Sequence, residues 1–297
     1  MKKYNVGIIG ATGMVGQRFI TLMENHPWFN VTALAASPRS AVKKYSEAVG
    51  KKWSMTRPIP EYAENMIVMD AQADMKKIAG MVDFAFCAVD MKKEEIRALE
   101  EAYARLECPI ISNNSAHRGT PDVPMIIPEL NAGHAAVIPF QRRRLGTSRG
   151  FIAVKSNCSL QSYVPALFPL NQFGIKQAVV CTYQAISGAG KTFESWPEMI
   201  DNVIPYIGGE EEKSELEPLK IWGEIKDGKI INAQYPQITA QCIRIPVSDG
   251  HTAAVFVRFD SKPSKEQILD IWANFKGRAQ ELELPSAPKQ FIRYMEE

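Results

Sequence analysis

Val6 to Ile20, written VGIIGATGMVGQRFI, carries the strongest fold signal in the chain, because Gly10, Gly13 and Gly16 follow a short apolar run at intervals of three residues. After a buried strand, one glycine permits a tight turn, a second lets the backbone approach a ligand, and a third lets the next helix pack on the strand. Free N–H groups at the start of that helix suit a pyrophosphate. The spacing GxxGxxG departs from the usual GxGxxG, and a purely structural turn would also explain it.

The position of this turn favours a dinucleotide site, because it is the first turn of a chain that goes on alternating apolar strands with helical stretches. We therefore expect cofactor contacts from residues of this turn, namely Gly10, Thr12, Gly13, Met14, Val15 and Gly16. The alternating elements that we expect are 4–9, 17–24, 31–35, 84–88, 92–105 and 109–112. Parallel strands joined by crossover helices give a Rossmann-like, doubly wound α/β sheet.

The composition changes at residues 141–150, QRRRLGTSRG, which are basic and resemble a loop. A run of this kind could bind phosphate, but a solvated linker is the simpler interpretation. We place the domain boundary here. The prediction is a dinucleotide-binding domain over 1–150 and an α+β catalytic and dimerisation domain over 151–297.

The second half predicts a helix-covered antiparallel sheet. Its expected strands are 178–185, 238–246 and 252–259, and Asp249-Gly250 is typical of a hairpin turn between the last two. Helices are expected after Cys158 and over 195–202, 210–221 and 265–275.

The overall charge excludes some classes of partner. With 35 basic and 33 acidic residues among 297, the net charge is +2, so no global field draws the protein to nucleic acid or to a lipid surface. Five cysteines without CxxC pairs, and a start without a long apolar segment, predict a cytoplasmic protein with reduced thiols. No apolar run is long enough for a membrane-spanning helix.

The end of the second expected strand indicates which dinucleotide is bound. An NAD site usually carries an acidic residue there for the ribose hydroxyl, whereas this chain reads Ala35-Ala36-Ser37-Pro38-Arg39-Ser40. Hydroxyls at Ser37 and Ser40 with the guanidinium of Arg39 suit a 2′-phosphate. A polar surface loop is the alternative. We predict NADP.

Cys158 is the candidate nucleophile. It lies between Asn157 and Ser159 where a strand ends and a helix is expected, and the N-terminus of a helix stabilises a thiolate. Most cysteines are small buried hydrophobic residues, and that interpretation suits the other four, which are Cys87, Cys108, Cys181 and Cys242.

A nucleophile needs a base, and His251 opens an expected strand seven residues after Arg244. Both could lie near one end of a hairpin, although a lone histidine is more often structural. Arg244 stands in an otherwise apolar strand and needs an anion to balance its burial. A substrate carboxylate would supply that anion.

Six segments together resemble aspartate-semialdehyde dehydrogenases of the type found in archaea and fungi, over nearly the whole chain. They are GATGMVGQRF, SNNSAHRGTPDVPMIIPELN, SNCS, QAISGAGK, EEEK and RIPVSDGH, in the family's order. The resemblance implies interconversion of aspartate 4-semialdehyde and 4-aspartyl phosphate with NADP, in the biosynthesis of lysine, threonine, methionine and isoleucine. It also implies a homodimer or homotetramer formed through the second domain.

By the family's pattern, Cys158 attacks the aldehyde or the acyl phosphate. His251 would be the acid/base and Gln184 would orient the intermediate. Asn157, beside the thiol, would stabilise the oxyanion. This chemistry is sound in itself, because a thiolate converts an aldehyde to a thiohemiacetal that can give up hydride, and phosphate can cut the resulting thioester.

For binding, the resemblance implies that Arg244 holds the substrate carboxylate and Glu210 its amino group. Lys213 and Arg118 would bind phosphate, with Asn114 in the same set. From spacing alone, Glu210 and Lys213 would be a helix start and a solvated lysine.

Ser187 and Gly188 would lie by the cofactor and the cysteine, or form only a flexible turn. Lys191 replaces the aromatic residue common in the family, and we assign it no role.

Family members continue for about sixty residues beyond Phe291, with a helix beside the nicotinamide, whereas this chain stops at Glu297. We expect the 297-residue form to bind NADP, to react at Cys158 with thiol reagents, and to turn over slowly or not at all. Two alternatives to the dehydrogenase stay open. One is a reductase of acyl thioesters similar to malonyl-CoA reductases, and the other is an inactive binding or assembly protein.

Overall fold

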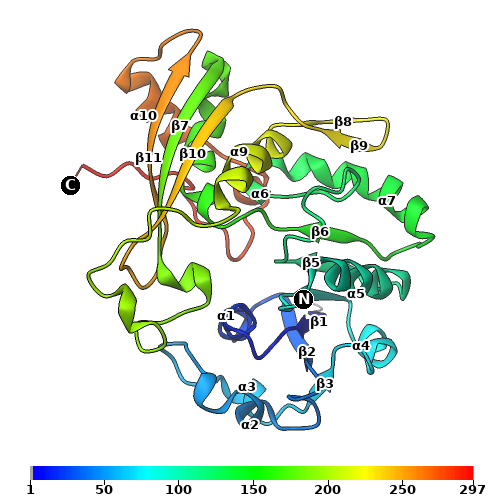
Figure 1. The fold of residues 1–297 in the computed structure, drawn as a ribbon. Helices are drawn as coiled ribbons and strands as arrows, with labels where there is room; N and C mark the ends of the chain where they lie inside the picture. The colour runs from blue at the N-terminus through cyan, green and yellow to red at the C-terminus, as the bar shows by residue number, and fades with distance from the viewer. Residues whose placement is uncertain (1–2, 297) are drawn as a thin grey trace. The chain divides into compact units, whose positions relative to one another are not determined.

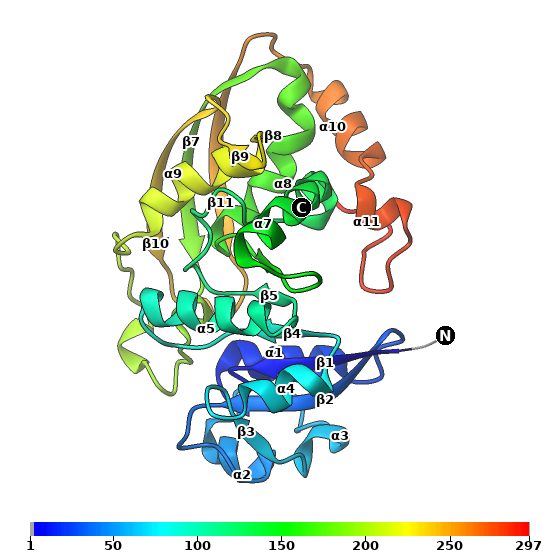
Figure 2. The ribbon, with the colours of Figure 1, turned by 90° about the vertical axis from the view of Figure 1, so that its right-hand side faces the viewer.

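The computed structural model describes residues 3–296, which form two compact units (Figures 1 and 2). The N-terminal unit comprises Met1–Pro124 and Ala135–Lys155. The C-terminal unit comprises Met125–His134 and Ser156–Glu297. No helix among the described residues combines the length and the apolar character that crossing a bilayer requires.

A six-stranded sheet forms the centre of the N-terminal unit, in the order β3-β2-β1-β4-β5-β6. Every neighbouring pair is parallel. The strands are β1 (Tyr4–Ile9), β2 (Phe29–Ala36), β3 (Val68–Asp70), β4 (Phe84–Cys87), β5 (Ile110–Ser112) and β6 (Ile152–Val154). The order reverses between β1 and β4, and such a switch point is where ligands bind in open parallel sheets. The predicted doubly wound sheet is confirmed.

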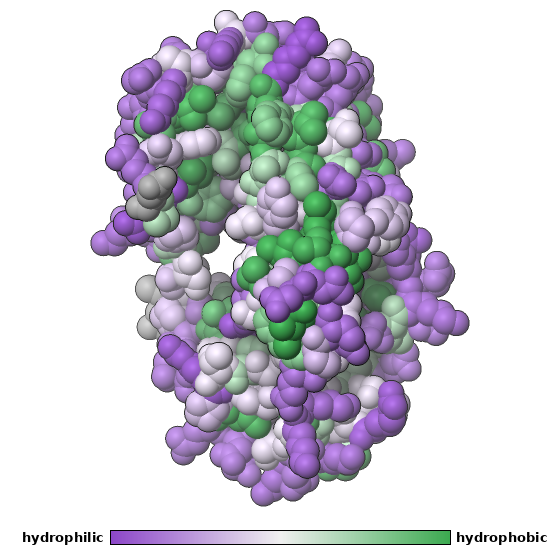
Figure 3. Space-filling model, turned by 60° about the vertical axis from the view of Figure 1, so that its left-hand side comes forward, coloured by the Kyte–Doolittle hydropathy of each residue, from purple (hydrophilic) through white to green (hydrophobic). Residues whose placement is uncertain are grey.

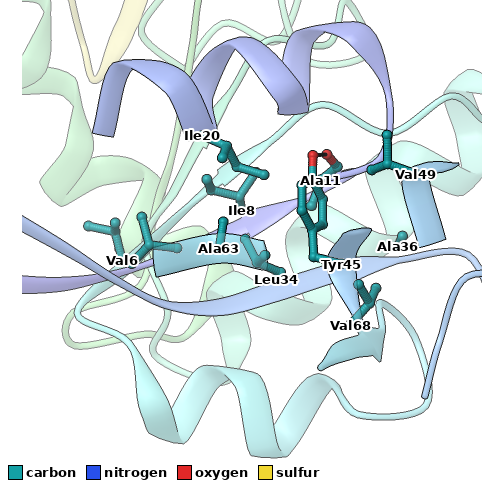
Figure 4. Close-up of a cluster of buried hydrophobic side chains, with 11 residues drawn as sticks. Val6, Ile8, Ala11, Ile20, Leu34, Ala36, Tyr45, Val49, Ala63 and Val68 are labelled. Atoms are coloured by element: carbon teal, nitrogen blue, oxygen red, sulfur yellow. Dashed lines mark hydrogen bonds between the residues drawn. The ribbon is translucent and has the colours of Figure 1, made fainter. Parts of the chain in front are cut away.

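Helices connect these strands, and apolar side chains fill the space between helix and sheet. The helices are α1 (Met14–Met23), α2 (Tyr45–Val49), η1 (Gly50–Lys52), α3 (Glu61–Glu64), α4 (Met75–Met81), α5 (Lys93–Arg105) and α7 (Ile138–Leu145). Figure 4 shows Ile8 of β1, Leu34 of β2 and Ile20 of α1 in one buried cluster. The hydroxyl of Tyr45 is buried there and donates to the carbonyl oxygen of Ala11 at 2.9 Å, which ties α2 to the glycine turn.

The basic stretch 141–150 differs from the expected linker, because its first half belongs to α7. The guanidinium of Arg144 forms ion pairs with Asp122 and Glu101, and that of Arg143 lies over the Phe140 ring. The helix ends at Gly146, whose φ of 72° is a conformation that glycine adopts at no cost. The first half of this run is therefore a helix whose Arg144 pairs with carboxylates.

The C-terminal unit is built on a three-stranded sheet, in the order β10-β7-β11. The strands are β7 (Ile175–Gln184), β10 (Gln237–Arg244) and β11 (Thr252–Phe259). The prediction of a purely antiparallel sheet is wrong, because β10 pairs with β7 in parallel and only β11 is antiparallel to it. The prediction of a hairpin at Asp249-Gly250 is also wrong, because β7 lies between β10 and β11. The turn signal was local, whereas the pairing is decided by a strand sixty residues earlier.

The remaining elements of this unit are mostly short. They are α6 (Pro128–Asn131), η2 (Ala132–Val137, which continues into the N-terminal unit), η3 (Ser159–Ser162), α8 (Val164–Leu167), η4 (Phe168–Phe173), η5 (Ile186–Ala189), η6 (Pro197–Met199), α9 (Glu210–Ile221), β8 (Glu224–Lys226), β9 (Lys229–Ile231), α10 (Lys265–Asn274) and α11 (Arg278–Glu281). The expected helix over 210–221 is confirmed. The one over 195–202 is reduced to the turn η6, since Pro197 removes a backbone donor.

Candidate active site

The three glycines of the first turn have three different surroundings. Gly10 has φ of 89°, and a Cβ there would stand 2.2 Å from the carbonyl oxygen of Ala88. A Cβ on Gly16 would stand 2.2 Å from the carbonyl oxygen of Gly10, so this glycine lets α1 pack on the turn. A Cβ on Gly13 would meet only the Gly10 oxygen, at 3.6 Å. Gly13 therefore has the open side on which a ligand can approach.

A cavity of about 350 Å³ opens at this turn, where β1 to β4 end. Gly13 caps the ten-residue helix α1, and no side chain fills that cap. Amide groups at an uncapped helix start, open space at Gly13 and a guanidinium in the lining fit a phosphate-bearing dinucleotide. The lining residues are Gly10, Thr12, Gly13, Ala36, Ser37, Pro38, Arg39, Asp70, Ala71, Gln72, Ala88, Val89, Asp90 and Met91.

Several predicted cofactor residues take different places around this cavity. Ser37 and Arg39 line it, whereas Ser40 closes a turn through its amide, which donates to the Ser37 carbonyl oxygen at 2.9 Å. Met14 and Val15 form the first turn of α1 outside the lining. Sequence reasoning missed the lining residues that follow β3 and β4. Their signal was topological, because all parallel strands end at the same edge of the sheet.

The sheet of the C-terminal unit brings three predicted site residues to one edge. Gln184 ends β7 and pairs in register with Arg244, which ends the parallel strand β10. His251 directly precedes β11, whose first residue, Thr252, pairs with Tyr183. Two strand ends and one strand start therefore meet at one edge, which explains why residues 184, 244 and 251 are neighbours.

Cys158 and His251 are in contact. The distance from His251 Nε2 to Cys158 Sγ is 3.3 Å. On the other side of the ring, the backbone N–H of Ala185 donates to His251 Nδ1 at 3.0 Å. The helix expected after Cys158 is reduced to two short turns, the four-residue 3-10 turn η3 and then α8. The imidazole of His251 contacts the sulfur, and the charge of Arg244 also acts on it.

Glu210 is the centre of a second cluster beside the cysteine. Its carboxylate accepts from Lys213 Nζ at 2.7 Å, from Asn157 Nδ2 at 3.0 Å and from Gln184 Nε2 at 3.4 Å. Burial raises the pKa of the Glu210 carboxyl, but the hydrogen bond and charge of Lys213, together with the hydrogen bonds of Asn157 and Gln184, outweigh it, so its pKa lies below the usual value. The site therefore holds an ionised carboxylate.

Asn157 has both ends of its side chain engaged. Its Oδ1 accepts from the backbone N–H of Ser159 at 2.8 Å, while its Nδ2 donates to Glu210. Its backbone N–H donates to the carboxylate of Glu217 at 2.6 Å. The residue before the cysteine thus fixes the local backbone and connects it to Glu210.

Arg244 is 5% exposed, and its Nη1 donates to the carbonyl oxygen of Ala185 at 2.8 Å. Burial lowers the pKa of this guanidinium, and the nearby carboxylate of Glu210 partly offsets that effect. A buried cation is costly without an anion. The site can therefore hold a ligand with a carboxylate for Arg244 and an ammonium group for Glu210.

Arg118 belongs to the N-terminal unit. Its Nε donates to the carbonyl oxygen of Lys155 at 2.9 Å and its Nη2 to that of Asn113 at 3.2 Å. The guanidinium is therefore held by backbone groups that follow β5 and β6, at the edge where the cavity lies.

Asn114, the other predicted contact in that unit, has an internal partner. Its Nδ2 donates to Glu100 Oε1 at 2.9 Å, and the Ser112 hydroxyl donates to the same oxygen at 2.5 Å. Glu100 has no exposed surface, and burial raises the pKa of its carboxyl. The structure thus gives Asn114 a part in holding the loop that leads to Arg118.

The turn after β7 contains Ser187 and Gly188. The Ser187 amide donates to the carbonyl oxygen of Ser248 at 3.2 Å, which ties this turn to the segment before His251. A Cβ on Gly188 would stand 2.8 Å from Cε1 of His251 and 2.9 Å from Nη1 of Arg244. Sequence reasoning missed Ala185, whose N–H donates to His251 and whose carbonyl oxygen accepts from Arg244. Any residue type offers these backbone groups, so the sequence does not indicate their role.

Family models and known proteins agree with this arrangement. Residues 5–138 match the model described as "Semialdehyde dehydrogenase, NAD binding domain", and residues 167–297 match "Semialdehyde dehydrogenase, dimerisation domain". The chain is 39% identical over 295 residues to the aspartate-semialdehyde dehydrogenase of Archaeoglobus fulgidus, covering 99% of this chain and 82% of that protein. It is 40% identical over 287 residues to the enzyme of the same name from Methanothermobacter thermautotrophicus, with 96% and 80% covered.

Solved structures share the fold. The crystal structure of aspartate semialdehyde dehydrogenase with NADP from Candida albicans superimposes with a TM-score of 0.85 at 34% identity. The match covers 97% of this chain and 81% of that one.

Proposed function

The chain belongs to the aspartate-semialdehyde dehydrogenase family, and from that premise we propose how its residues interconvert aspartate 4-semialdehyde and 4-aspartyl phosphate. The enzyme is an NADP-dependent oxidoreductase of amino-acid biosynthesis. The observation that carries the assignment of residues is the 3.3 Å contact between the Cys158 sulfur and the His251 ring, beside a buried arginine and an ionised glutamate.

Cys158 is the nucleophile in this proposal. Its sulfur bonds to the aldehyde carbon, and the carbonyl electron pair moves to oxygen to give a thiohemiacetal. Loss of hydride from that carbon leaves a thioester on Cys158. A phosphate oxygen then attacks the thioester carbon, and the bond to sulfur breaks to release the acyl phosphate and regenerate the thiolate.

The substrate is recognised through its two charged groups. Arg244 pairs with the α-carboxylate, which supplies the anion that its burial requires. Glu210 pairs with the α-ammonium. In the structure its carboxylate accepts a hydrogen bond from Lys213 Nζ at 2.7 Å, and the substrate ammonium would bind in place of this amine or beside it. Gln184 and Asn157 keep the carboxylate oriented through their amides. Lys213 and Arg118 provide positive charge for phosphate.

NADP, when bound, supplies the hydride acceptor. Gly10 and Gly13 would hold its pyrophosphate at the start of α1, and Ser37 and Arg39 would hold the 2′-phosphate. Arg39 lines the cavity at the end of β2, where an NAD enzyme usually carries a carboxylate. This arrangement supports NADP over NAD.

The assay that tests the function follows reduction of NADP with aspartate semialdehyde, with and without phosphate. We expect reduction that depends on both substrate and phosphate and is lost after alkylation of Cys158. Oxidation of NADPH with malonyl-CoA is the parallel measurement. Turnover of malonyl-CoA, without turnover of the semialdehyde, would assign the chain to the acyl-thioester reductases instead.

We further infer a homodimer formed through the sheet of the C-terminal unit, and a homotetramer where two such dimers associate. Phe256 of β11 is 75% exposed and lies in register opposite Val179 of β7, which is 54% exposed. Figure 3 shows hydrophobic side chains at the surface of this unit, in the upper half of the view. Two large apolar side chains on one open sheet face favour a second copy as the partner.

Light scattering of the wild type and of Phe256→Glu measures this assembly. We expect a dimer or tetramer for the wild type and a shift toward monomer for the variant. An unchanged mass for Phe256→Glu would place the interface elsewhere.

The cellular location that we propose is the cytoplasm. The five cysteines are all free, and Cys87, Cys108 and Cys242 are buried. Unpaired buried thiols suit a reducing compartment.

A further inference from the structure

The outer edge of β10 is held by the helix that carries Glu210. β10 is an edge strand, because it stands at the end of the order β10-β7-β11. Away from β7, the backbone N–H of Ala240 donates to the carboxylate of Glu215 at 3.0 Å, and that of Cys242 donates to Glu211 at 3.3 Å. Both carboxylates come from α9, which lies beside β10 (Figures 1 and 2). Two side chains therefore cover an edge that would otherwise expose unpaired amides.

The spacing of these two carboxylates matches the spacing of the two amides. Four residues of an α-helix advance by about 6 Å, and two residues of a parallel strand advance by about 6.6 Å. Successive amides of a strand point in opposite directions, so the amide of Gln241 faces β7 and cannot replace either of the two. A slip of one residue between α9 and β10 would therefore break both bonds. The two bonds specify how far along the strand the helix lies.

The next outward amide of β10 belongs to Arg244, and its partner is main chain. It donates to the carbonyl oxygen of Ile204 at 2.9 Å, and the Ile204 amide donates back to the Arg244 carbonyl oxygen at 3.0 Å. On its other side, Arg244 pairs in register with Gln184 of β7. The end of β10 is therefore fixed by backbone pairing on both sides, whereas the place of α9 against β10 depends on side-chain bonds.

Further contacts of α9 reach the segment of the nucleophile. Glu210 accepts from Asn157 Nδ2 at 3.0 Å, and the carbonyl oxygen of Ser214 accepts from the Tyr163 hydroxyl at 2.7 Å. Cys158 lies in this segment, directly after Asn157. The helix is thus bonded both to the segment that carries the thiol and to the strand that ends at the buried arginine.

We propose that Glu211 and Glu215 are positioning residues that determine specificity for an α-amino acid, because they set the place of Glu210 on α9 relative to Arg244 on β10. This proposal rests on the proposed function for the roles of Glu210 and Arg244. The α-carboxylate and the α-ammonium of the substrate are attached to the same carbon atom, so the two groups that bind them must stand at one fixed separation. Glu211 directly follows Glu210, and its partner Cys242 lies two residues before Arg244. The bond between them therefore joins the two binding groups through few residues.

The kinetic test compares aspartate semialdehyde with succinate semialdehyde, which is the same aldehyde without the amino group. Glu215→Met removes the hydrogen-bond acceptor and keeps the length of the side chain. We expect its kcat/KM for aspartate semialdehyde to fall about tenfold, since a displacement of about 1 Å costs on the order of a hundredfold and the Glu211 bond would remain. Its kcat/KM for succinate semialdehyde should stay near that of the wild type, because Arg244 keeps its place. Equal losses for the two substrates, or no loss for either, would overturn the proposal.

The conservative variant Glu215→Gln separates the hydrogen bond from the charge. Glutamine has no charge, but its amide oxygen can still accept from the Ala240 amide. We therefore expect kcat/KM for aspartate semialdehyde to stay near the wild-type value in this variant. A loss as large as that of Glu215→Met would show that the charge matters and the bond to β10 does not, which would contradict the proposal.

Glu212→Met is the matched control for Glu211→Met. Both residues lie in the first turn of α9, but Glu212 is exposed, whereas Glu211 is partly buried and bonded to β10. The two variants lose the same charge at the same end of the helix. We expect only Glu211→Met to lower kcat/KM for aspartate semialdehyde relative to succinate semialdehyde. The same loss in Glu212→Met would contradict the proposal, because it would come from the helix charge alone.

Amide hydrogen exchange, followed by NMR of the full chain, measures the two bonds without turnover. We expect the amides of Ala240 and Cys242 to exchange about tenfold faster when Glu211→Met and Glu215→Met are combined, the value of one lost hydrogen bond. The amide of Val180, in the central strand β7, should be unaffected. Unchanged exchange at Ala240 and Cys242 would overturn the proposal. A wild type that does not reduce NADP with aspartate semialdehyde would instead refute the proposed function, and the exchange result would stand apart from it.

Discussion

Gly16 near the turn after β1 and Gly188 in the turn after β7 both occupy places where a Cβ does not fit, but the atoms that exclude it differ. At Gly16 the obstacles are backbone atoms of Gly10 and Ala11, at 2.2 and 2.7 Å. At Gly188 they are the side chains of His251 and Arg244. Backbone cannot yield without moving β1 and α1, whereas side chains can rotate. We therefore expect the first glycine to be required for the fold, and the second for the placement of the His251 and Arg244 side chains.

The same contrast holds for the two sites as wholes. The cavity of the N-terminal unit is shaped by main chain and by the ends of parallel strands. The site of the C-terminal unit is shaped by charged side chains that hold one another, such as Glu210 and Lys213. Substitutions should therefore separate nucleotide binding from catalysis.

Cys158→Ala should give the largest effect, on the order of a thousandfold or more in kcat, because the covalent route is lost. NADP affinity and melting temperature should stay near those of the wild type, since the nucleotide cavity belongs to the other unit. Steady-state kinetics measures kcat, and nucleotide titration measures the affinity for NADP. Substantial residual turnover would remove Cys158 from its role.

Gly16→Ala should destabilise the protein by about 1 to 3 kcal/mol, as overpacking against a fixed backbone does. The matched control is Gly80→Ala in α4, where a Cβ meets nothing within 4 Å and should be neutral or mildly stabilising. Urea unfolding measures both. Loss of activity in Gly16→Ala without loss of stability would contradict the conclusion that Gly16 is required for the fold.

Arg39→Ala should weaken NADP binding about ten- to a hundredfold, the value of one charge-assisted bond to phosphate, and leave NAD binding nearly unchanged. Fluorescence titration with each nucleotide gives the ratio. An equal loss for both nucleotides would mean that Arg39 supports the loop and does not contact the 2′-phosphate.

Glu210→Gln should change the free energy of unfolding by the smallest amount of these variants, and this change should depend on pH. The folded-state pKa of Glu210 lies below its usual value near 4.5, so its ionised form stabilises the fold above that pH, and the contribution is lost as pH falls through the lowered pKa. Because Lys213 is a third exposed, we expect about 1 kcal/mol or less. Urea unfolding of both proteins from pH 7 to 3.5 should give a difference that shrinks below about pH 4.5. A constant difference would show that the carboxylate charge contributes nothing.

The N-terminal unit was largely predictable from the sequence, because its signals are local. The strand over residues 4–9 was predicted to the residue, and the parallel order followed from alternation of strands and helices. The cavity-lining residues at the ends of β3 and β4 were not predictable. The residue types at Asp70 and Ala88 do not indicate that these strand ends line a cavity.

In the C-terminal unit the sequence predicted the positions of helices and strands, but not which strands pair. The helix from Glu210 to Ile221 was predicted with correct bounds. The Asp249-Gly250 turn predicted that β10 and β11 pair as a hairpin, whereas β7 lies between them in the sheet. Long-range pairing leaves no short-range pattern. The contact of Cys158 with His251 depends on this pairing, and sequence spacing alone left His251 undecided.

The in-register pairing of β7 with both of its neighbours has a consequence for changes in chain length. Side chains alternate between the faces of a strand, so one residue inserted or deleted within β7 would turn every later side chain to the opposite face, Gln184 included. Arg244 and His251 would keep their places, whereas the Gln184 side chain would no longer face the same side of the sheet. The strands β8 and β9 form a two-stranded sheet of their own within residues 3–296, and their hairpin carries no such constraint. Evolution and protein engineering should therefore find single-residue length variation tolerated at the Asp227-Gly228 turn and eliminated between Ile175 and Gln184.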